Sequence, residues 1–172
     1  MTTFSKKVRI YESECSKNNI PEETVMAYLV ELSNRERYNL YMNFDEEMPE
    51  ELEKEFDAGM VRILKDEPLG HVLGYSWFYV YKMAVNGDVL IPRYETEELC
   101  GHILARIDTY FPDAEKLNVA DVGTGSGAIA IALCKEEPKI DMCATDISVE
   151  ALETAKLNAK TNEADITFYA GD

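Results

Sequence analysis

Apolar positions divide the chain into an amino-terminal part with helical periodicity and a carboxyl-terminal part in which short apolar runs alternate with helical patterns. In three segments before residue 65, apolar side chains recur every three or four positions, which predicts amphipathic helices. Their apolar faces are Phe4, Val8, Tyr11 and Cys15; Val25, Tyr28, Leu29 and Leu32; and Leu52, Phe56, Met60, Ile63 and Leu64. Pro21 and Pro49, each followed by two glutamates, mark the starts of the last two helices. A further short helix is expected at residues 35–42, so this part predicts a small helical bundle.

The residues after this bundle favour β-structure. Residues 75–81 are rich in aromatic side chains and predict a strand that packs between two domains. Asn86-Gly87, which precedes the apolar run 89–91, is a strong turn signal and predicts a β-hairpin at that point. A helix is then expected over residues 98–110. Its inward face is predicted to consist of Leu99, Ile103, Leu104 and Ile107.

Strands and helices alternate in the last third of the chain, which is typical of a doubly wound parallel sheet. Strands are predicted at the apolar runs near residues 117–122, 140–146 and 166–170. A helix of small residues follows the first strand, and Ser148 is placed to cap a second helix. The buried face of that second helix is expected to contain Ala151, Leu152, Ala155 and Leu157. The pattern predicts an α/β fold.

A glycine-rich loop between the first of these strands and its helix carries the main chemical signal. Asp121–Gly127 read D-V-G-T-G-S-G, in which glycines permit unusual backbone angles and close approach of a ligand to the main chain. The spacing G-x-G-x-G differs from the dinucleotide fingerprint G-x-G-x-x-G and fits a loop that holds S-adenosylmethionine. The glycines would give access to the backbone, the hydroxyl residues would add polar contacts, and Asp121 would accept a hydrogen bond from the ammonium group. The predicted loop contacts are Asp121, Gly123, Thr124, Gly125, Ser126 and Gly127.

Acidic residues end the next two predicted strands. Asp146 lies 19 residues after Gly127, where a carboxylate that binds ribose hydroxyls is expected. Its neighbour Ile147 is included in the predicted site, and Asp172 lies where it could reach the adenine. The alternative for either acid is a solvated residue at the end of a strand.

Four segments resemble the glutamine methyltransferases that modify peptide chain release factors. Residues 66–74 resemble the segment G-E-P-L-x-Y-I-x-G of that family, and residues 89–97 resemble its V-L-I-P-R-P-E-T-E. Residues 121–133 match its cofactor loop and helix, and residues 145–159 match the strand and helix that follow. Tyr94 stands where the family usually has proline.

The resemblance implies a class I S-adenosylmethionine-dependent methyltransferase that methylates the glutamine side-chain amide of a release factor. It implies a helical substrate-docking domain over residues 1–70, a linking β-hairpin over residues 71–92 and the first half of a Rossmann-like methyltransferase domain over residues 93–172. The alternative for the helical domain is a stabilising cap without partner contacts. Arg93 and Glu95 would line the mouth of the active site or, alternatively, cap and pair at the helix start.

The catalytic Asn-Pro-Pro-Tyr motif of that family does not occur in these 172 residues. We therefore expect a chain that ends before the catalytic residues and is inactive alone. An unpaired first strand would then favour self-association through the sheet edge. Two other functions stay open: an adenine amino methyltransferase of DNA or RNA, and a non-catalytic fragment that binds the cofactor.

Composition narrows the partners and the compartment. A formal net charge of −16 disfavours nucleic acid, because its binding depends on lysine and arginine. The acidic run at residues 45–57 predicts a solvated helix face or, alternatively, a contact with a basic patch on a protein. No apolar run approaches the roughly 18 residues that a membrane span needs, and no signal peptide is visible. The four cysteines are scattered, so free thiols, no metal site and a cytoplasmic location are expected.

Overall fold

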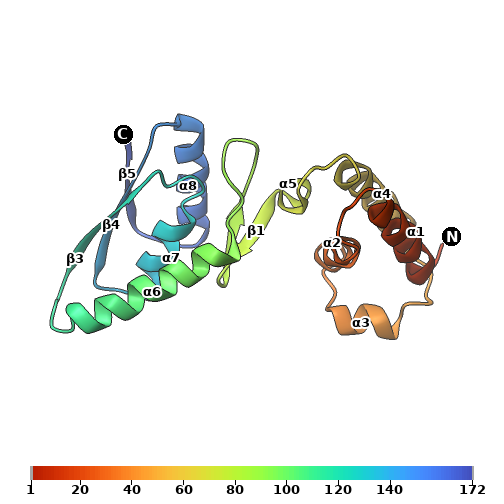
Figure 1. Ribbon diagram of the computed structural model, residues 1–172, viewed down its shortest axis with the longest axis horizontal. Coiled ribbons are helices and arrows are strands. Elements are labelled where there is room, and N and C mark those ends of the chain that lie inside the picture. The colour runs from red at the N-terminus through yellow and green to blue at the C-terminus, as the bar shows by residue number, and fades with distance from the viewer. Residues whose placement is uncertain (1, 172) are drawn as a thin grey trace. The chain divides into compact units, whose positions relative to one another are not determined.

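The computed structural model describes residues 2–171 (Figure 1). The chain divides into two compact units, Met1–Leu73 and Gly74–Asp172. The described part of the first unit is helical apart from an isolated β-bridge between Thr3 and Glu47, and the second unit contains an antiparallel hairpin and a parallel sheet with helices. The predicted succession of a helical bundle, a hairpin and a parallel sheet with helices is therefore confirmed.

The first unit is a bundle with a single apolar core. Its helices are α1 (Phe4–Lys17), α2 (Glu23–Ser33), α3 (Arg37–Met42), α4 (Glu50–Ile63) and α5 (Leu69–Leu73). The four predicted helices are all present, and α5 is an addition that follows Pro68. The Arg62 guanidinium donates to the carbonyls of His71 and Val72 at 3.2 Å, which holds the end of this short helix. A helix of five residues is too short to show a periodic apolar pattern.

Aromatic stacking and close helix contact hold α2 against α4. The buried ring of Phe56 stacks on Tyr28 with a centroid distance of 5.5 Å and meets the edge of Tyr11 at the same distance. The Tyr28 hydroxyl donates to the Glu55 carbonyl at 3.2 Å. A Cβ atom at Gly59 would overlap the Tyr28 ring, so this position requires glycine for the two helices to meet.

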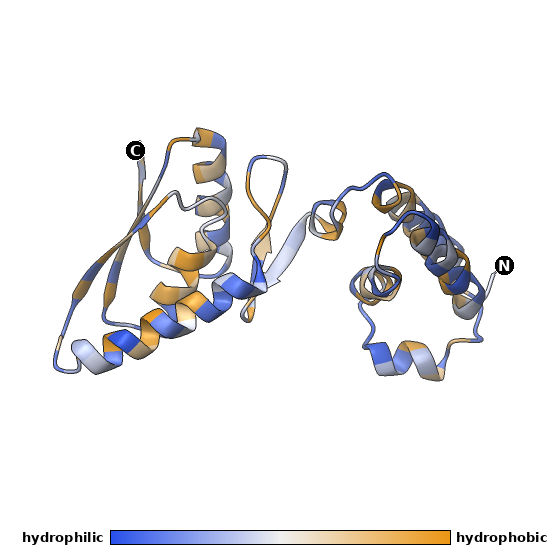
Figure 2. Cartoon of the chain, viewed as in Figure 1, coloured by the Kyte–Doolittle hydropathy of each residue, from blue (hydrophilic) through white to orange (hydrophobic). Residues whose placement is uncertain are grey.

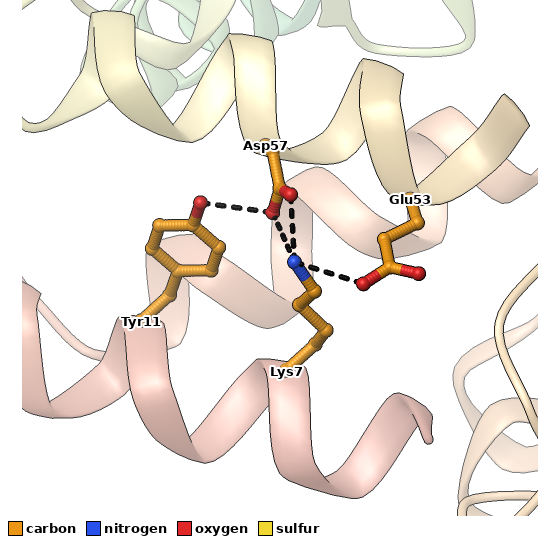
Figure 3. Close-up of polar contacts among 4 residues, drawn as sticks. All are labelled: Lys7, Tyr11, Glu53 and Asp57. Carbon is orange, nitrogen blue, oxygen red and sulfur yellow. Dashed lines mark hydrogen bonds and ion pairs between the residues drawn. The ribbon is translucent and has the colours of Figure 1, made fainter. Parts of the chain in front are cut away.

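A network of charged side chains joins α1 to α4 (Figure 3). Lys7 Nζ lies 2.7 and 2.6 Å from the two carboxylate oxygens of Asp57 and 3.1 Å from Glu53 Oε1. The Tyr11 hydroxyl donates to Asp57 at 2.9 Å. Burial lowers the pKa of Lys7, but the bonds to Asp57 and Glu53 outweigh it, so the pKa of Lys7 is raised. The same bond from Lys7 lowers the pKa of Glu53.

The second unit begins with a short hairpin whose position differs from the prediction. Strands β1 (Tyr75–Phe78) and β2 (Tyr81–Ala84) pair antiparallel and are joined by a turn at Tyr79-Val80. The single strand predicted over residues 75–81 is therefore wrong, and so is the hairpin turn predicted at Asn86-Gly87.

Tertiary contacts explain this shift of the turn. The Tyr79 N–H donates to Glu97 Oε1 and the Tyr79 hydroxyl donates to the Glu97 carbonyl, both at 2.8 Å, which fixes the reversal at a residue with φ of 53°. Residues Asn86–Val89 do form a turn, since the Asp88 N–H donates to Asn86 Oδ1 at 2.9 Å. However, residues 89–91 do not continue as a strand.

A three-stranded parallel sheet follows in the order β3-β4-β5 (Figure 1). Its strands are β3 (Leu117–Val122), β4 (Ile140–Asp146) and β5 (Ile166–Ala170), and the helices are α6 (Tyr94–Tyr110), α7 (Ala128–Glu136) and α8 (Val149–Thr161). Figure 2 shows that α7 is mostly hydrophobic, in agreement with its buried place in the core. Within residues 2–171, β3 has a strand partner only on the β4 side.

Two predicted core residues lie outside the core. Leu99 is 49% exposed and Leu157 is 54% exposed. In α6 the buried stripe runs through Cys100 and Ile107, and Leu99 lies off this stripe, about 100° around the helix from Cys100. α6 also begins at Tyr94, four residues before the predicted start.

Candidate cofactor-binding site

The glycine-rich loop connects β3 to α7 and forms the centre of the candidate site. Gly123, Gly125 and Gly127 have positive φ angles of 78°, 55° and 81°, which side chains other than glycine rarely adopt. The N–H groups of Gly123 and Thr124 donate to the Thr145 carbonyl at 2.9 and 2.8 Å. The Gly127 N–H donates to the Thr124 carbonyl at 2.9 Å. Strand β4 thus fixes the start of the loop, and the turn leads directly into α7.

The three glycines have different surroundings. A Cβ atom at Gly123 or Gly125 would meet no atom within 4 Å, so the main chain is open there. A Cβ atom at Gly127 would lie 3.2 Å from the Ala155 Cβ of α8. The first two glycines therefore leave room for a ligand against the backbone, and the third allows two helices to pack closely.

Asp146 lies at the end of β4 and binds the loop directly. Its Oδ2 atom accepts a hydrogen bond from the Gly125 N–H at 2.8 Å, and its Oδ1 atom accepts one from the Ser148 N–H at 3.0 Å. Its carbonyl accepts a hydrogen bond from the Gly171 N–H at 3.0 Å. A carboxylate offers about four acceptor positions, so both oxygens keep capacity for hydroxyl groups of a ligand. The predicted ribose contact of Asp146 stays a prediction, and the structure adds a second role in shaping the loop.

Asp121, at the start of the loop, is tied to its neighbour. The Thr124 hydroxyl donates to Asp121 Oδ2 at 2.7 Å, which leaves Asp121 Oδ1 for another donor. The side chains of Thr124 and Ser126 are buried, so any contact of these residues with a ligand is best placed on their backbone.

Burial first, and then the charge of Asp121, raise the pKa of Cys100 to about 11, so this thiol is neutral at pH 7.

Ile147 and Ser148 directly follow Asp146 in the sequence. Ile147 is 78% exposed, which leaves an apolar side chain accessible next to the carboxylate. Ser148 caps α8 as predicted, since its hydroxyl oxygen accepts from the Ala151 N–H at 3.1 Å. Asp172, the last predicted contact, lies outside the described residues.

Arg93 and Glu95 lie at the start of α6 and are exposed. The Arg93 carbonyl accepts from the Thr96 N–H at 3.0 Å. Within residues 2–171, neither side chain caps the helix and the two do not form an ion pair with each other, so the capping alternative is not what the structure shows. Their place at an active-site mouth stays a prediction.

One buried residue near the loop was missed from the sequence. Asn158 of α8 donates through Nδ2 to the Ser126 carbonyl at 2.8 Å and is 1% exposed. The available signal was its position, since Asn158 falls seven residues after Ala151 on the predicted apolar face of α8. A polar residue on such a face needs buried partners.

Residues 2–171 contain neither a cluster of metal ligands nor a helix that could span a membrane. Between residues 2 and 171, no group of three or more His, Cys, Asp or Glu side chains is arranged to hold a metal ion. In the same part of the chain, every helix is too short or too polar to cross a lipid bilayer.

Both units of the chain match domains of known protein families. The PrmC N-terminal domain matches residues 11–74, and the methyltransferase small domain matches residues 104–172. The release factor glutamine methyltransferase of Bacillus cereus is 40% identical over an alignment of 174 positions, which covers 96% of this chain and 60% of that protein. The Bacillus subtilis protein of the same name is 36% identical over 162 residues, or 94% of this chain and 55% of that protein.

One solved structure is similar to part of this chain. The tRNA (uracil-54, C5)-methyltransferase of Pyrococcus abyssi, in complex with S-adenosyl-L-homocysteine, superposes with a TM-score of 0.46 and 18% identity over 57% of this chain and 23% of that chain. The present chain spans about three fifths of the length of the relatives from Bacillus cereus and Bacillus anthracis. The strand and helix order agrees with part of a class I methyltransferase fold. The matches to both of its units and to these relatives support membership of the release factor glutamine methyltransferase family.

Proposed function

We propose that this chain supplies the cofactor-binding part of an S-adenosylmethionine-dependent methyltransferase that modifies a glutamine of a peptide chain release factor. The observation that carries the proposal is the open loop at Gly123 and Gly125, held by the Asp146 carboxylate. The names of the relatives support the substrate class. Because the chain spans about three fifths of those relatives, the activity of the whole protein is part of the proposal.

The residues of the loop divide the work of holding the cofactor. The free acceptor capacity of Asp146 suits the two ribose hydroxyls, and the exposed Ile147 offers an apolar surface for the adenine. Asp121 Oδ1 is available for the ammonium group of the methionine part. The open backbone at Gly123 and Gly125 lets that part lie against the main chain. When bound, the cofactor supplies a methyl group on a sulfonium, so these residues serve to bind and orient it.

The helical unit is proposed to help hold the release factor. The match of residues 11–74 to the PrmC N-terminal domain supports this proposal. The exposed Arg93 and Glu95 are proposed to face the substrate at the start of α6.

The catalytic motif implied by the family does not occur among these 172 residues. We therefore propose that they bind the cofactor without transferring its methyl group. In the family that motif accepts hydrogen bonds from the substrate amide, and no residue of the present site is placed in that role.

The test combines calorimetry with a transfer assay. S-adenosylmethionine is titrated into the 172-residue chain, and methyl-labelled cofactor is then incubated with purified release factor and either this chain or the same chain extended by the Asn-Pro-Pro-Tyr region of a relative. We expect saturable binding by both proteins and transfer only by the extended one. Transfer by the 172-residue chain would contradict the division of roles, and no measurable binding by either protein would contradict the proposal as a whole.

A further inference from the structure

Three polar side chains, two on one face of α8 and one at the residue that caps its end, bind the hairpin and the residues just after it. Thr154, Asn158 and Asn162 are spaced four residues apart and therefore lie above one another on the helix. Asn162 Nδ2 donates to the Lys82 carbonyl of β2 at 3.0 Å. Asn86 Nδ2 donates to Thr154 Oγ1 at 3.3 Å. This face therefore binds that part of the chain through polar contacts over about two helical turns.

Among these three residues, Asn158 forms hydrogen bonds with both β2 and the glycine-rich loop. Its Oδ1 atom accepts from the Ala84 N–H at 2.7 Å, and its Nδ2 group donates to the Ala84 carbonyl at 3.0 Å. The second hydrogen of Nδ2 is donated to the Ser126 carbonyl at 2.8 Å, inside the glycine-rich loop. One fully buried amide therefore links the end of β2 to the candidate site and uses both of its donors to do so.

Apolar packing around Asn158 joins the same three segments. Ala155, one turn earlier in α8, lies against Gly127 of the loop. At the start of α8, Ala151 forms a small core with Val85 and Val89, and Ile91 packs against it. This core leads directly to Arg93, so the helix connects the loop with the segment 85–93.

We propose that Asn158 is a positioning residue that couples the glycine-rich loop to β2 and the segment 85–93. A ligand that restrains the loop backbone also restrains the Ser126 carbonyl, and through the Asn158 amide it restrains the bonds to Ala84. Cofactor bound at the loop thereby steadies the segment that carries Arg93. The identity of this ligand rests on the proposed function, whereas the link itself rests on the hydrogen bonds of Asn158.

Hydrogen exchange at the Ala84 amide measures this coupling. Its N–H is bonded to Asn158, so its exchange reports the opening of that bond. In the wild-type chain, S-adenosylmethionine at about 100 times its dissociation constant is expected to slow this exchange roughly tenfold. A buried asparagine with a packing role alone would let the cofactor slow Ala84 exchange only as much as that of other core amides of the same unit, because binding stabilises the whole folded unit.

Two variants separate the coupling from general stability. Asn158→Leu keeps a similar volume and removes all three bonds, so we expect the exchange of Ala84 to lose its response to the cofactor and the dissociation constant to rise about five- to tenfold. Asn162→Ala removes a hairpin bond without touching the loop, so the cofactor response and the dissociation constant should stay within about twofold of wild type. The wild-type comparison needs no variant and stands even if Asn158→Leu does not fold.

The outcomes distinguish this inference from the proposed function. Binding of S-adenosylmethionine by the wild-type chain without a change in Ala84 exchange would overturn the coupling and leave the proposed function intact. Binding by Asn158→Leu as tight as that of wild type would also overturn the coupling. No binding of S-adenosylmethionine by the wild-type chain would overturn the proposed function and the coupling with it.

Discussion

The helical unit and the candidate site of the second unit depend on different kinds of contact. In the helical unit, large apolar side chains such as Phe4, Phe56 and Met60 fill one core, and the polar network of Lys7 lies at its margin. In the second unit, the contacts that shape the candidate site are hydrogen bonds to backbone groups, made by Asp146 and Asn158. The comparison shows that the first unit depends on side-chain volume, and the site depends on glycine geometry and on polar contacts with the main chain.

The strongest test of this contrast removes a large side chain from the helical core. Phe56→Ala should destabilise the helical unit by about 3–5 kcal/mol, because it leaves a cavity and removes two aromatic contacts. Helix unfolding followed by circular dichroism should shift to lower urea. Fluorescence of Trp77, the single tryptophan, reports the second unit and should keep its midpoint. Tyr38→Ala, at an exposed position of α3, is the matched control and should change neither signal.

The corresponding change in the second unit acts on the backbone. Gly127→Val should destabilise that unit by about 3 kcal/mol, because φ is 81° and the added atoms would press on Ala155. The Trp77 midpoint is expected to fall and the helical unit to be unaffected. Gly87→Ala is the control, since a Cβ atom there meets no atom within 4 Å. Equal shifts of both units in either variant would show that the contrast between them is wrong.

A change at Asp146 is expected to affect binding more than folding. Asp146→Asn replaces one of the two acceptor oxygens with a donor group, which would face the N–H group of either Gly125 or Ser148. We expect the affinity for S-adenosylmethionine in calorimetry to fall at least about tenfold, which corresponds to roughly 1.4 kcal/mol. Asp141→Asn, on the exposed face of the same strand, should bind like wild type. Unchanged affinity in Asp146→Asn would remove this carboxylate from the site.

The free edge of β3 should make the second unit the part that associates. Within residues 2–171 this strand is paired only with β4, and an unpaired edge can pair with another chain. Sedimentation at increasing concentration is expected to show reversible dimers. Ala120→Lys, which places a charge on an exposed position of β3, should weaken them. A monomer at all concentrations would contradict this prediction.

The smallest effect is expected for the charged network of the helical unit. The pKa of Glu53 is lowered, so its contribution to stability is present above pH 4.5 and is lost as the pH falls through the value in the folded state. The pKa of Lys7 is raised, so its contribution is present below pH 10.5 and is lost as the pH rises through the folded value. Lys7→Met should weaken both the acid and the alkaline dependence of the free energy of unfolding, measured with urea at a series of pH values.

A neighbouring ion pair serves as the control for that experiment. Lys54 and Glu50 form an exposed pair on α4, and such pairs contribute about 0.5 kcal/mol or less. Lys54→Met should therefore keep the pH profile of wild type. If Lys7→Met also kept that profile, the network would have no measurable role in stability.

Much of the fold could be predicted because local patterns and tertiary structure agree. The apolar stripe of α1 and the cap at Ser148 both appear where the sequence places them. The hairpin could not be placed, because its turn is fixed by Glu97, which is 18 residues away from Tyr79 in sequence. The local turn signal at Asn86-Gly87 therefore did not determine the position of the hairpin, because a contact between residues distant in the sequence fixes its turn.

In the candidate site, too, some residues could be predicted from the sequence and others could not. The glycines and Asp146 were recognised because their spacing follows from how a strand, a turn and a helix must meet around a ligand. Asn158 was missed, because its partners Ala84 and Ser126 are backbone groups far from it in sequence, and backbone groups carry no residue-type signal. The exposure of Leu157 was missed because every second or third residue of α8 is apolar, which leaves the orientation of the helix to its packing.

The central claim is that the open loop in the second unit is a binding site for S-adenosylmethionine. It is tested most directly by titrating the cofactor into the ¹⁵N-labelled chain and following the backbone amide signals by nuclear magnetic resonance. The account predicts saturable shifts at Gly123, Gly125 and Ile147, with no change along α1 to α4. Signals that stay in place at these three residues, or that move only in the helical unit, would contradict it.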